Sequence, residues 1–187
     1  MTKARLYLDF DGVVNALSRN KGMRVGSTGW DDWISKHIRP LYASGRYLVN
    51  VATGLVDEIN DLSDMGVDVV WLSSWNSDTQ VFSDKLGFHE FRYVQTGPLG
   101  VMESTFEEWK LDPLLEDVYD YPVDTVAWAE DNLDEMNGFE AGKGTFATVN
   151  TERFIPNIYA LRTDPRYGIT RNAMKCLRRH LLGDSIE

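Results

Sequence analysis

Short apolar segments alternate with amphipathic segments along most of the chain, and polar residues follow each apolar segment. The clearest helix is predicted over 53–65, where three apolar residues fall on one face and Gly66 follows as a stop. The clearest strand is predicted over 67–72, because a nearly continuous apolar run is typical of a strand covered on both faces. Further strands are predicted at 6–10, 47–51, 91–94, 125–129 and 145–149, helices at 77–86 and 170–182, and loop and helix over 104–115.

This alternation of strands with helices predicts an α/β fold with an open, mostly parallel sheet, in a single domain over 1–187. The segment 15–46 is irregular and is predicted as an insertion, partly helical near Trp33. The segment 163–187 is predicted to end the domain with a basic helix. In such sheets ligands bind beyond the carboxyl ends of the strands, so the residues that follow each apolar segment are candidates for a functional site.

Composition and charge narrow the class of protein. Of 187 residues, 43% are hydrophobic and 26% are charged, which is typical of a globular domain and excludes a disordered or fibrous chain. The single cysteine, Cys176, excludes an internal disulfide and a cysteine-cluster zinc site. No apolar run approaches the roughly 20 residues of a transmembrane helix, and no apolar leader follows Met1, so we expect a cytoplasmic protein without a membrane partner. The net charge of −10 repels bulk nucleic acid but is compatible with a local basic patch.

Acidic residues follow two of the predicted strands. Asp9 and Asp11 end the first, where their spacing places both on one side of the strand and Gly12 permits a sharp turn. Glu130 and Asp131 follow the strand over 125–129. Each group alone is also typical of a solvated turn. Carboxylates that converge at one sheet edge repel one another, and because all-oxygen ligand sets with room for water favour Mg²⁺, we expect a magnesium site there.

Hydroxyl and basic residues complete the candidate site. Ser73 and Ser74 follow the strand over 67–72, where they either bind phosphate oxygens or cap the next helix. Lys110 is the only basic residue among thirteen acidic ones between Glu103 and Glu140, and it is either a surface lysine or a ligand for a phosphoryl group. Carboxylates, a cation, a hydroxyl and an ammonium together are what phosphoryl transfer requires.

This set of residues resembles the motifs of haloacid-dehalogenase-like (HAD) hydrolases, in the family's order, over 5–150. The first family motif, Asp-x-Asp-Gly after a strand, corresponds to Asp9-Phe10-Asp11-Gly12; the second, a Ser or Thr at a strand end, to Ser73; the third, a Lys, to Lys110; and the fourth, an acidic pair, to Glu130-Asp131. The resemblance implies a Rossmann-like three-layer sandwich with a central, mostly parallel sheet and a small cap, which the insertion over 15–46 would supply.

The resemblance also implies a role for each matched residue. Asp9 would be the nucleophile that forms an aspartyl-phosphate, and Asp11 the general acid and then the general base. Ser73 and Lys110 would bind the phosphoryl oxygens. Mg²⁺ would be held by Asp9, by the backbone carbonyl of Asp11, and by Asp131 or Glu130. Glu130 stands where the family usually has Asp, so Glu130, Asp131, or Asp131 together with Glu135 remain open as the second set of ligands.

Finer details are similar to the HAD domain of the Swiss Army Knife RNA repair group. They are the stretches VVWLSSWN and VAWAEDN, the pair Trp109-Lys110 and the segment 163–170. This resemblance implies a phosphatase that acts on nucleic-acid ends or nucleotides, and the short insertion, which favours an open site, agrees with a large substrate. The residues expected to contact the substrate are Gly12, Ser74, Trp75 and Asn76.

Other interpretations remain open. Small phosphate esters are alternative substrates, and Trp30, Trp33 and Trp75 either stack on a base or pack in the core. A phosphoacceptor receiver domain also gathers acids, a hydroxyl and a lysine, but its lysine follows the acids, whereas Lys110 precedes Glu130. An inactive binding module is a third reading. No obligate protein partner is evident.

Overall fold

A central six-stranded sheet organises the protein, and our computed structural model describes residues 3–97, 107–133, 146–149 and 158–183. The strand order is β5-β4-β1-β6-β8-β7. The first five of these strands run parallel, and β7 lies antiparallel to β8 at the edge. The strands are β1 (Ala4–Leu8), β4 (Asp68–Trp71), β5 (Arg92–Tyr93), β6 (Thr125–Glu130), β7 (Phe146–Val149) and β8 (Ile158–Arg162). The predicted α/β fold with a mostly parallel sheet is therefore confirmed.

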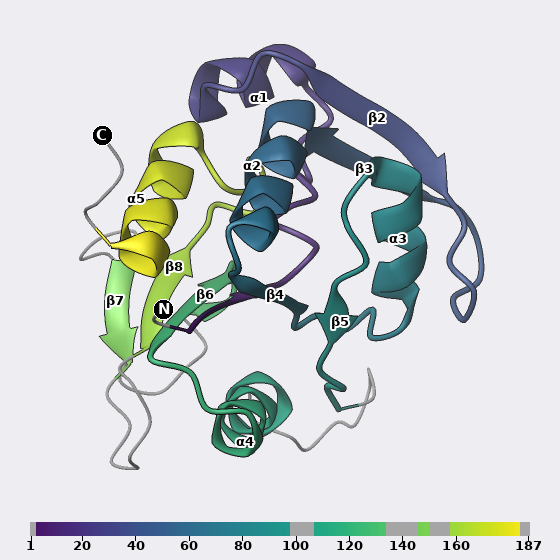
Figure 1. Cartoon of the computed structure of the whole chain (residues 1–187). Coiled ribbons are helices and arrows are strands. Elements are labelled where there is room, and N and C mark those ends of the chain that lie inside the picture. Colours follow the sequence, from purple (N-terminus) through teal and green to yellow (C-terminus); the bar gives the residue numbers. More distant parts are fainter. Residues whose placement is uncertain (1–2, 98–106, 134–145, 150–157, 184–187) are drawn as a thin grey trace.

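Helices cover both faces of the sheet (Figure 1). Helices α2 (Thr53–Asp64) and α5 (Arg171–Leu182) lie on one face, and α4 (Asp112–Asp120) lies on the other. Side chains of β1 alternate between the two resulting cores, with Leu6 and Leu8 in the first and Tyr7 in the second. This alternation follows from the period of two along a strand and explains why the strand segments are apolar on both sides.

The chain changes direction across the sheet next to β1, and this defines where a ligand can bind. From β1 the chain moves outward to β4 and β5, and it then returns to β6 on the other side of β1. The register sets Leu8 opposite both Trp71 and Ala129, so the three strands end at the same level. The residues that follow, beginning with Asp9, therefore meet at the topological switch point.

Residues between β1 and α2 form a short helix and a hairpin. Helix α1 (Lys21–Thr28) precedes strand β2 (Trp33–Ile38), which pairs antiparallel with β3 (Tyr47–Ala52) in a separate two-stranded sheet. The prediction of helix near Trp33 was wrong, because the helix ends at Thr28 and Trp33 begins a strand. The predicted strand over 47–51 is confirmed, but it lies outside the central sheet.

Hydrogen bonds from the hairpin loop, and from Trp30 just before the hairpin, hold this region to the rest of the domain. The backbone N–H groups of Leu41 and Tyr42, between β2 and β3, donate to the Asp78 carboxylate at the start of α3 (Asp78–Leu86), at 2.6 and 3.2 Å. The indole N–H of Trp30 donates to the Ile169 carbonyl at 2.8 Å. The hairpin is therefore fixed next to the loop between β4 and α3.

Strand β8 was not predicted from the sequence. It lies between β6 and β7, with Val126 opposite Ile158 and Glu130 opposite Arg162. The predicted helix over 170–182 agrees better, since α5 covers most of this range; residues 184–187 lie outside the described part. Of the segment 104–115, the described residues form a π-helical turn (Glu107–Leu111) that leads into α4. Within the described residues, none of the helices has the length and apolarity needed to cross a bilayer.

Candidate functional site

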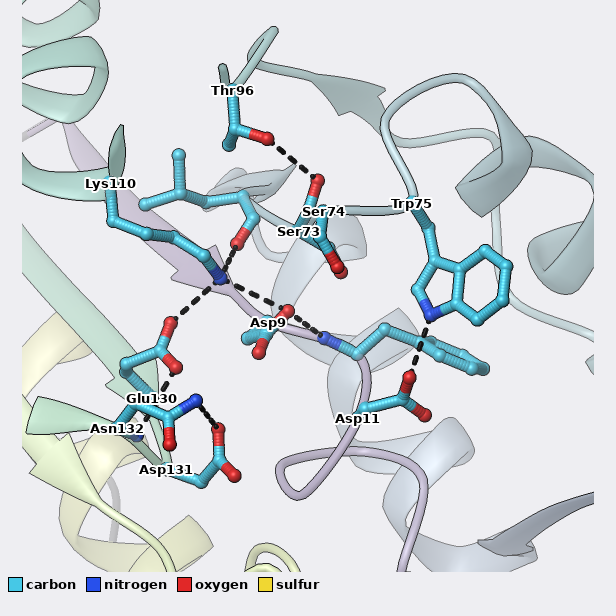
Figure 2. A network of polar contacts seen from close by, with 12 residues as sticks. Asp9, Asp11, Ser73, Ser74, Trp75, Thr96, Lys110, Glu130, Asp131 and Asn132 are labelled. Atoms are coloured by element: carbon cyan, nitrogen blue, oxygen red, sulfur yellow. Dashed lines mark hydrogen bonds and ion pairs between the residues drawn. The ribbon is translucent and has the colours of Figure 1, made fainter. Parts of the chain in front are cut away.

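Asp9 lies at the centre of the candidate site, directly after β1 (Figure 2). It is 6% exposed, and its backbone N–H donates to the Ala129 carbonyl at 3.1 Å, which extends the pairing with β6 by one residue. Its Oδ1 accepts hydrogen bonds from the Phe10 N–H at 2.7 Å and from the Lys110 ammonium at 3.2 Å. Oδ2 is therefore the oxygen of Asp9 that is available for chemistry or for a metal.

Lys110 reaches the site from the π-helical turn on the other side of the sheet from α2. Its Nζ lies 2.9 Å from Glu130 Oε2, 2.9 Å from the Leu72 carbonyl oxygen and 3.2 Å from Asp9 Oδ1 (Figure 2). Its side chain is only 1% exposed, so this ammonium is not a surface charge. Burial lowers the pKa of Lys110, but the negative charges of Asp9 and Glu130 outweigh burial and raise it overall.

Glu130 and Asp131 differ in how they are held. Glu130 is completely buried, with Oε2 on Lys110 and Oε1 accepting the Asn132 N–H at 3.3 Å. Asp131 is partly exposed, and its Oδ1 accepts the side-chain N–H of Asn132 at 3.2 Å. Glu130 is therefore occupied by internal contacts on both oxygens, whereas the hydrogen bond from Asn132 engages only Oδ1 of Asp131.

The carboxylates of Asp9, Glu130 and Asp131 each have an oxygen within 4.8 Å of the others. Burial raises the pKa of Glu130 well above its ordinary value, and the charge of Asp9 raises it further. Burial also raises the pKa of Asp131, again with a contribution from Asp9. Because the raised pKa values disfavour the ionised forms of these carboxyl groups, and Lys110 supplies the one ammonium among the described residues that contacts them, a divalent cation would favour their ionised forms.

Asp11 lies on the other side of Asp9 and is not part of this group of carboxylates (Figure 2). Its Oδ1 accepts the side-chain N–H of Asn15 at 2.5 Å, and its Oδ2 accepts the indole N–H of Trp75 at 2.8 Å. Burial raises the pKa of Asp11; the hydrogen bonds from Asn15 and Trp75 oppose this shift without cancelling it, and the charge of Asp9 adds to it. A carboxyl group in this environment binds a proton more readily than an exposed one.

The loop after β4 carries the predicted hydroxyl and amide residues. Ser73 is buried, and its Oγ has no hydrogen-bond partner among the described residues, while its carbonyl accepts from Thr96 Oγ1 at 3.3 Å. Asn76 has a left-handed backbone with a φ of 46°, and its Oδ1 accepts the Thr96 N–H at 2.8 Å. Its amide also donates to the Ser74 carbonyl at 3.3 Å. Asn76 therefore fixes the loop, and the Ser73 hydroxyl is the buried donor left for a ligand.

Gly12 allows the first loop to approach Asp131 closely. Its φ of 72° is in the left-handed region, and a Cβ built on it would collide with the Asp131 carboxylate and with Pro165. Its carbonyl accepts a hydrogen bond from Thr163 Oγ1 at 2.8 Å. The predicted glycine thus lets the loop pass next to the acidic group.

Sequence reasoning missed several contacts at the site. Asn15 and the Leu72 carbonyl had no assigned role. Asn15 follows Asp11 by four residues, and this spacing could have indicated a contact between their side chains. Glu135, an alternative metal ligand, lies outside the described residues. Of the tryptophans considered for base stacking, Trp30 is 3% exposed and the Trp33 ring is covered by the Arg24 guanidinium at 4.9 Å.

The fold and the site together define an α/β protein with a buried acid–lysine cluster at its topological switch point. We compared the chain with protein-family models, with curated proteins and with solved structures, and none of the three comparisons gave a match. The function of the site must therefore be argued from its own geometry.

Proposed function

We propose that the protein is a Mg²⁺-dependent phosphomonoesterase of the HAD type, with Asp9 as the nucleophile. The observation that carries this proposal is that Asp9, Lys110, Glu130 and Asp131, which come from three separate parts of the chain, meet at one sheet edge with Lys110 bonded to two of the acids. A carboxylate held beside a buried ammonium and next to further acids suits transfer of a phosphoryl group.

The donor set fits magnesium. The carboxylates of Asp9 and Asp131, with the backbone carbonyl of Asp11 expected from the family resemblance, would supply hard oxygen ligands and leave positions for water and phosphate. Glu130 is the weaker candidate, because both of its oxygens already accept hydrogen bonds. When bound, Mg²⁺ would neutralise negative charge on the phosphoryl group.

The chain's own residues account for the two steps of the reaction. In the first, Asp9 Oδ2 forms a bond to phosphorus, the bond to the leaving oxygen breaks, and Asp11 donates a proton to that oxygen. In the second, Asp11 accepts a proton from water, whose oxygen attacks phosphorus, and the bond to Asp9 breaks to release phosphate. The free hydroxyl of Ser73 would bind a phosphoryl oxygen throughout. The three N–H groups of Lys110 already face Leu72, Glu130 and Asp9, so Lys110 would stabilise the phosphoryl group through its charge.

Hydrolysis of p-nitrophenyl phosphate with and without Mg²⁺ tests this proposal. Asp9→Asn should abolish turnover, Asp11→Asn should reduce it strongly, and Asp57→Asn, at an exposed position of α2, should leave it unchanged. Metal-independent hydrolysis, or full activity in Asp9→Asn, would refute the mechanism. A phosphorylated protein that forms but does not turn over would indicate a receiver-like domain instead.

We further propose that the substrate is a nucleic-acid end or a nucleotide. The segment 15–47 carries six basic and two acidic residues in a chain of net charge −10, so positive charge is concentrated there. The loop between β2 and β3 exposes Leu41 by 72% and Tyr42 by 81%, and Asp78 holds its backbone next to the loop that carries Ser73. Basic residues and an exposed tyrosine in this segment suit a phosphate chain with a base that stacks.

Rates on a panel of phosphomonoesters test the substrate class. We expect higher kcat/KM for oligonucleotides with a 3′ or 5′ phosphate, or for nucleotides, than for sugar phosphates of similar charge. Tyr42→Ala should raise KM for the oligonucleotides only, whereas Tyr119→Ala, which removes a tyrosine 78% exposed on α4, should not. Equal rates on all substrates would contradict this part of the proposal and favour small phosphate esters.

A further inference from the structure

Asp11 is held by two N–H donors from different loops, one on each oxygen. Asn15, in the loop after β1, donates to Oδ1 at 2.5 Å, and Trp75, in the loop after β4, donates to Oδ2 at 2.8 Å. Neither donor can accept a proton. The two contacts therefore fix the plane of the carboxyl group, and because each oxygen has a second lone pair, a proton can still bind it.

The amide of Asn15 can point in only one direction. Its Oδ1 accepts the backbone N–H of Asn50, in β3, at 2.8 Å, so its NH₂ group is the part that faces Asp11. Asn15 is 4% exposed, and its own backbone N–H donates to the Phe10 carbonyl at 2.8 Å. Both the backbone and the side chain of this donor are thus fixed by the surrounding structure.

The indole of Trp75 is fixed in a similar way. Its ring contacts Phe82, in α3, at a centroid distance of 5.1 Å, and Tyr47, in β3, at 4.7 Å, edge-to-face in both cases. These contacts hold the ring while its N–H points at Asp11 (Figure 2). The hydrogen bond and the two ring contacts therefore fix the position of the Trp75 side chain within the protein.

We propose that Asn15 and Trp75 are positioning residues that orient Asp11 for proton transfer to and from the substrate, an inference that rests on the function proposed above. A fixed carboxyl group transfers its proton without first losing rotational freedom, so the two donors should act on the step in which Asp11 transfers the proton and little on substrate binding. They should matter most where the leaving oxygen needs that proton.

Substrates with different leaving groups test this inference. Benzyl phosphate has a poor leaving group that requires protonation, whereas p-nitrophenolate leaves readily without it. Trp75→Phe keeps a ring and removes the N–H, and Asn15→Ala removes the second donor. We expect each variant to lower kcat/KM, which reports the steps up to departure of the leaving group, by about 10- to 100-fold for benzyl phosphate and much less for p-nitrophenyl phosphate.

Two controls separate positioning from a structural effect. Trp33→Phe removes an indole N–H that bonds the Trp30 carbonyl at 3.0 Å, away from Asp11, and should change neither rate. In an Asp11→Asn background, adding Trp75→Phe should cause no further loss, because the two residues act through the same group. If Asn15→Ala does not fold, Trp75→Phe decides the question alone.

Each outcome has a distinct meaning. Equal losses of kcat/KM on both substrates, or a further loss in the Asp11→Asn background, would overturn the positioning role while leaving the phosphatase assignment intact. A wild-type protein that hydrolyses neither substrate with Mg²⁺ would overturn the proposed function and this inference with it. A selective loss on benzyl phosphate supports both.

Discussion

The ammonium of Lys110 has almost no contact with water, so its charge acts directly on its neighbours. At 1% exposure it compensates Asp9 and Glu130, which are themselves buried. A charge removed from such a group leaves the remaining ones unpaired in a poorly polarisable environment, which costs more than the pair contributed. Lys110 thus stabilises the fold as well as serving the proposed reaction.

Lys110→Met should therefore destabilise the protein by about 3–5 kcal/mol, because two buried carboxylates lose their only cation. Unfolding by urea at neutral pH measures this change. Lys85→Met, which breaks the exposed ion pair with Asp84, is the matched control and should leave the free energy of unfolding almost unchanged. Equal, small effects of both substitutions would contradict the internal role of Lys110.

Without a metal, substitution of Asp131 should have the opposite effect on stability from substitution of Lys110. Because Asp131→Asn removes one of three clustered negative charges, we expect the unfolding midpoint in a chelator to stay the same or rise. In contrast, the increase in midpoint that Mg²⁺ produces in the wild type should be lost. Thermal unfolding with and without Mg²⁺ measures both effects, and a variant that is still stabilised by Mg²⁺ would argue against Asp131 as a ligand.

At the scale of elements, the turn after β1 decides whether the first and last parts of the site can meet. Gly12 and Gly66 both have positive φ angles, of 72° and 91°, but a Cβ would collide with Asp131 at Gly12 and meets nothing within 4 Å at Gly66. Substitutions at Gly12 and Gly66 therefore distinguish the effect of backbone strain from that of a collision with a neighbouring side chain.

Gly12→Ala should lower stability more than Gly66→Ala and should also weaken the stabilisation by Mg²⁺, because the added methyl group displaces the Asp131 carboxylate. Gly66→Ala should cost only the strain of the left-handed backbone, about 1–2 kcal/mol. Calorimetry with and without Mg²⁺ distinguishes the two variants. An unchanged response to Mg²⁺ in Gly12→Ala would show that the contact with Asp131 has no bearing on metal binding.

An element or contact could be predicted from the sequence where neighbouring residues along the chain specify it. The strands β4 and β6 were predictable because long apolar runs ended in polar residues, and the same rule placed Asp9, Ser73 and Glu130 at strand ends. Strand β8 also begins with an apolar run, Ile158 to Leu161, that ends in polar residues, so the same rule would have found it; in the structure it pairs with β6. The hydrogen bonds from Asn15 and Trp75 to Asp11 could not be predicted, because they depend on side-chain directions that only the folded chain sets.

At the scale of the whole molecule, a second charged network joins the layers at the opposite end of β1. Asp117, in α4, accepts hydrogen bonds from Tyr7 at 2.5 Å and from Arg92, in β5, at 2.7 and 2.8 Å. Arg5 adds a contact at 3.1 Å. Burial alone would raise the pKa of Asp117, but hydrogen bonds from Arg92 and Tyr7 and the nearby charges lower it below its ordinary value.

Asp117→Asn should therefore destabilise the protein by about 3 kcal/mol at neutral pH. Since the folded-state pKa lies below the ordinary value of 3.8, the contribution of Asp117 is complete above that pH and is lost as the pH falls through the folded-state value. Urea unfolding from pH 7 to pH 3 should show the gap between wild type and variant narrowing at the acidic end. Asp120→Asn, at an exposed position of the same helix, is the control, and a gap that stays constant with pH would count against this account.

The strands β1, β4 and β6 end at the same level of the sheet, and this arrangement affects the rates of folding and unfolding. Asp9 and Asp131 are separated by most of the chain, so they come together only when β1 is already paired with β6. A cation that needs both residues finds no partial site in an early folding intermediate, and it should slow unfolding without accelerating folding. The half-life of the native state, rather than the speed at which it is reached, would then depend on the magnesium concentration around the protein.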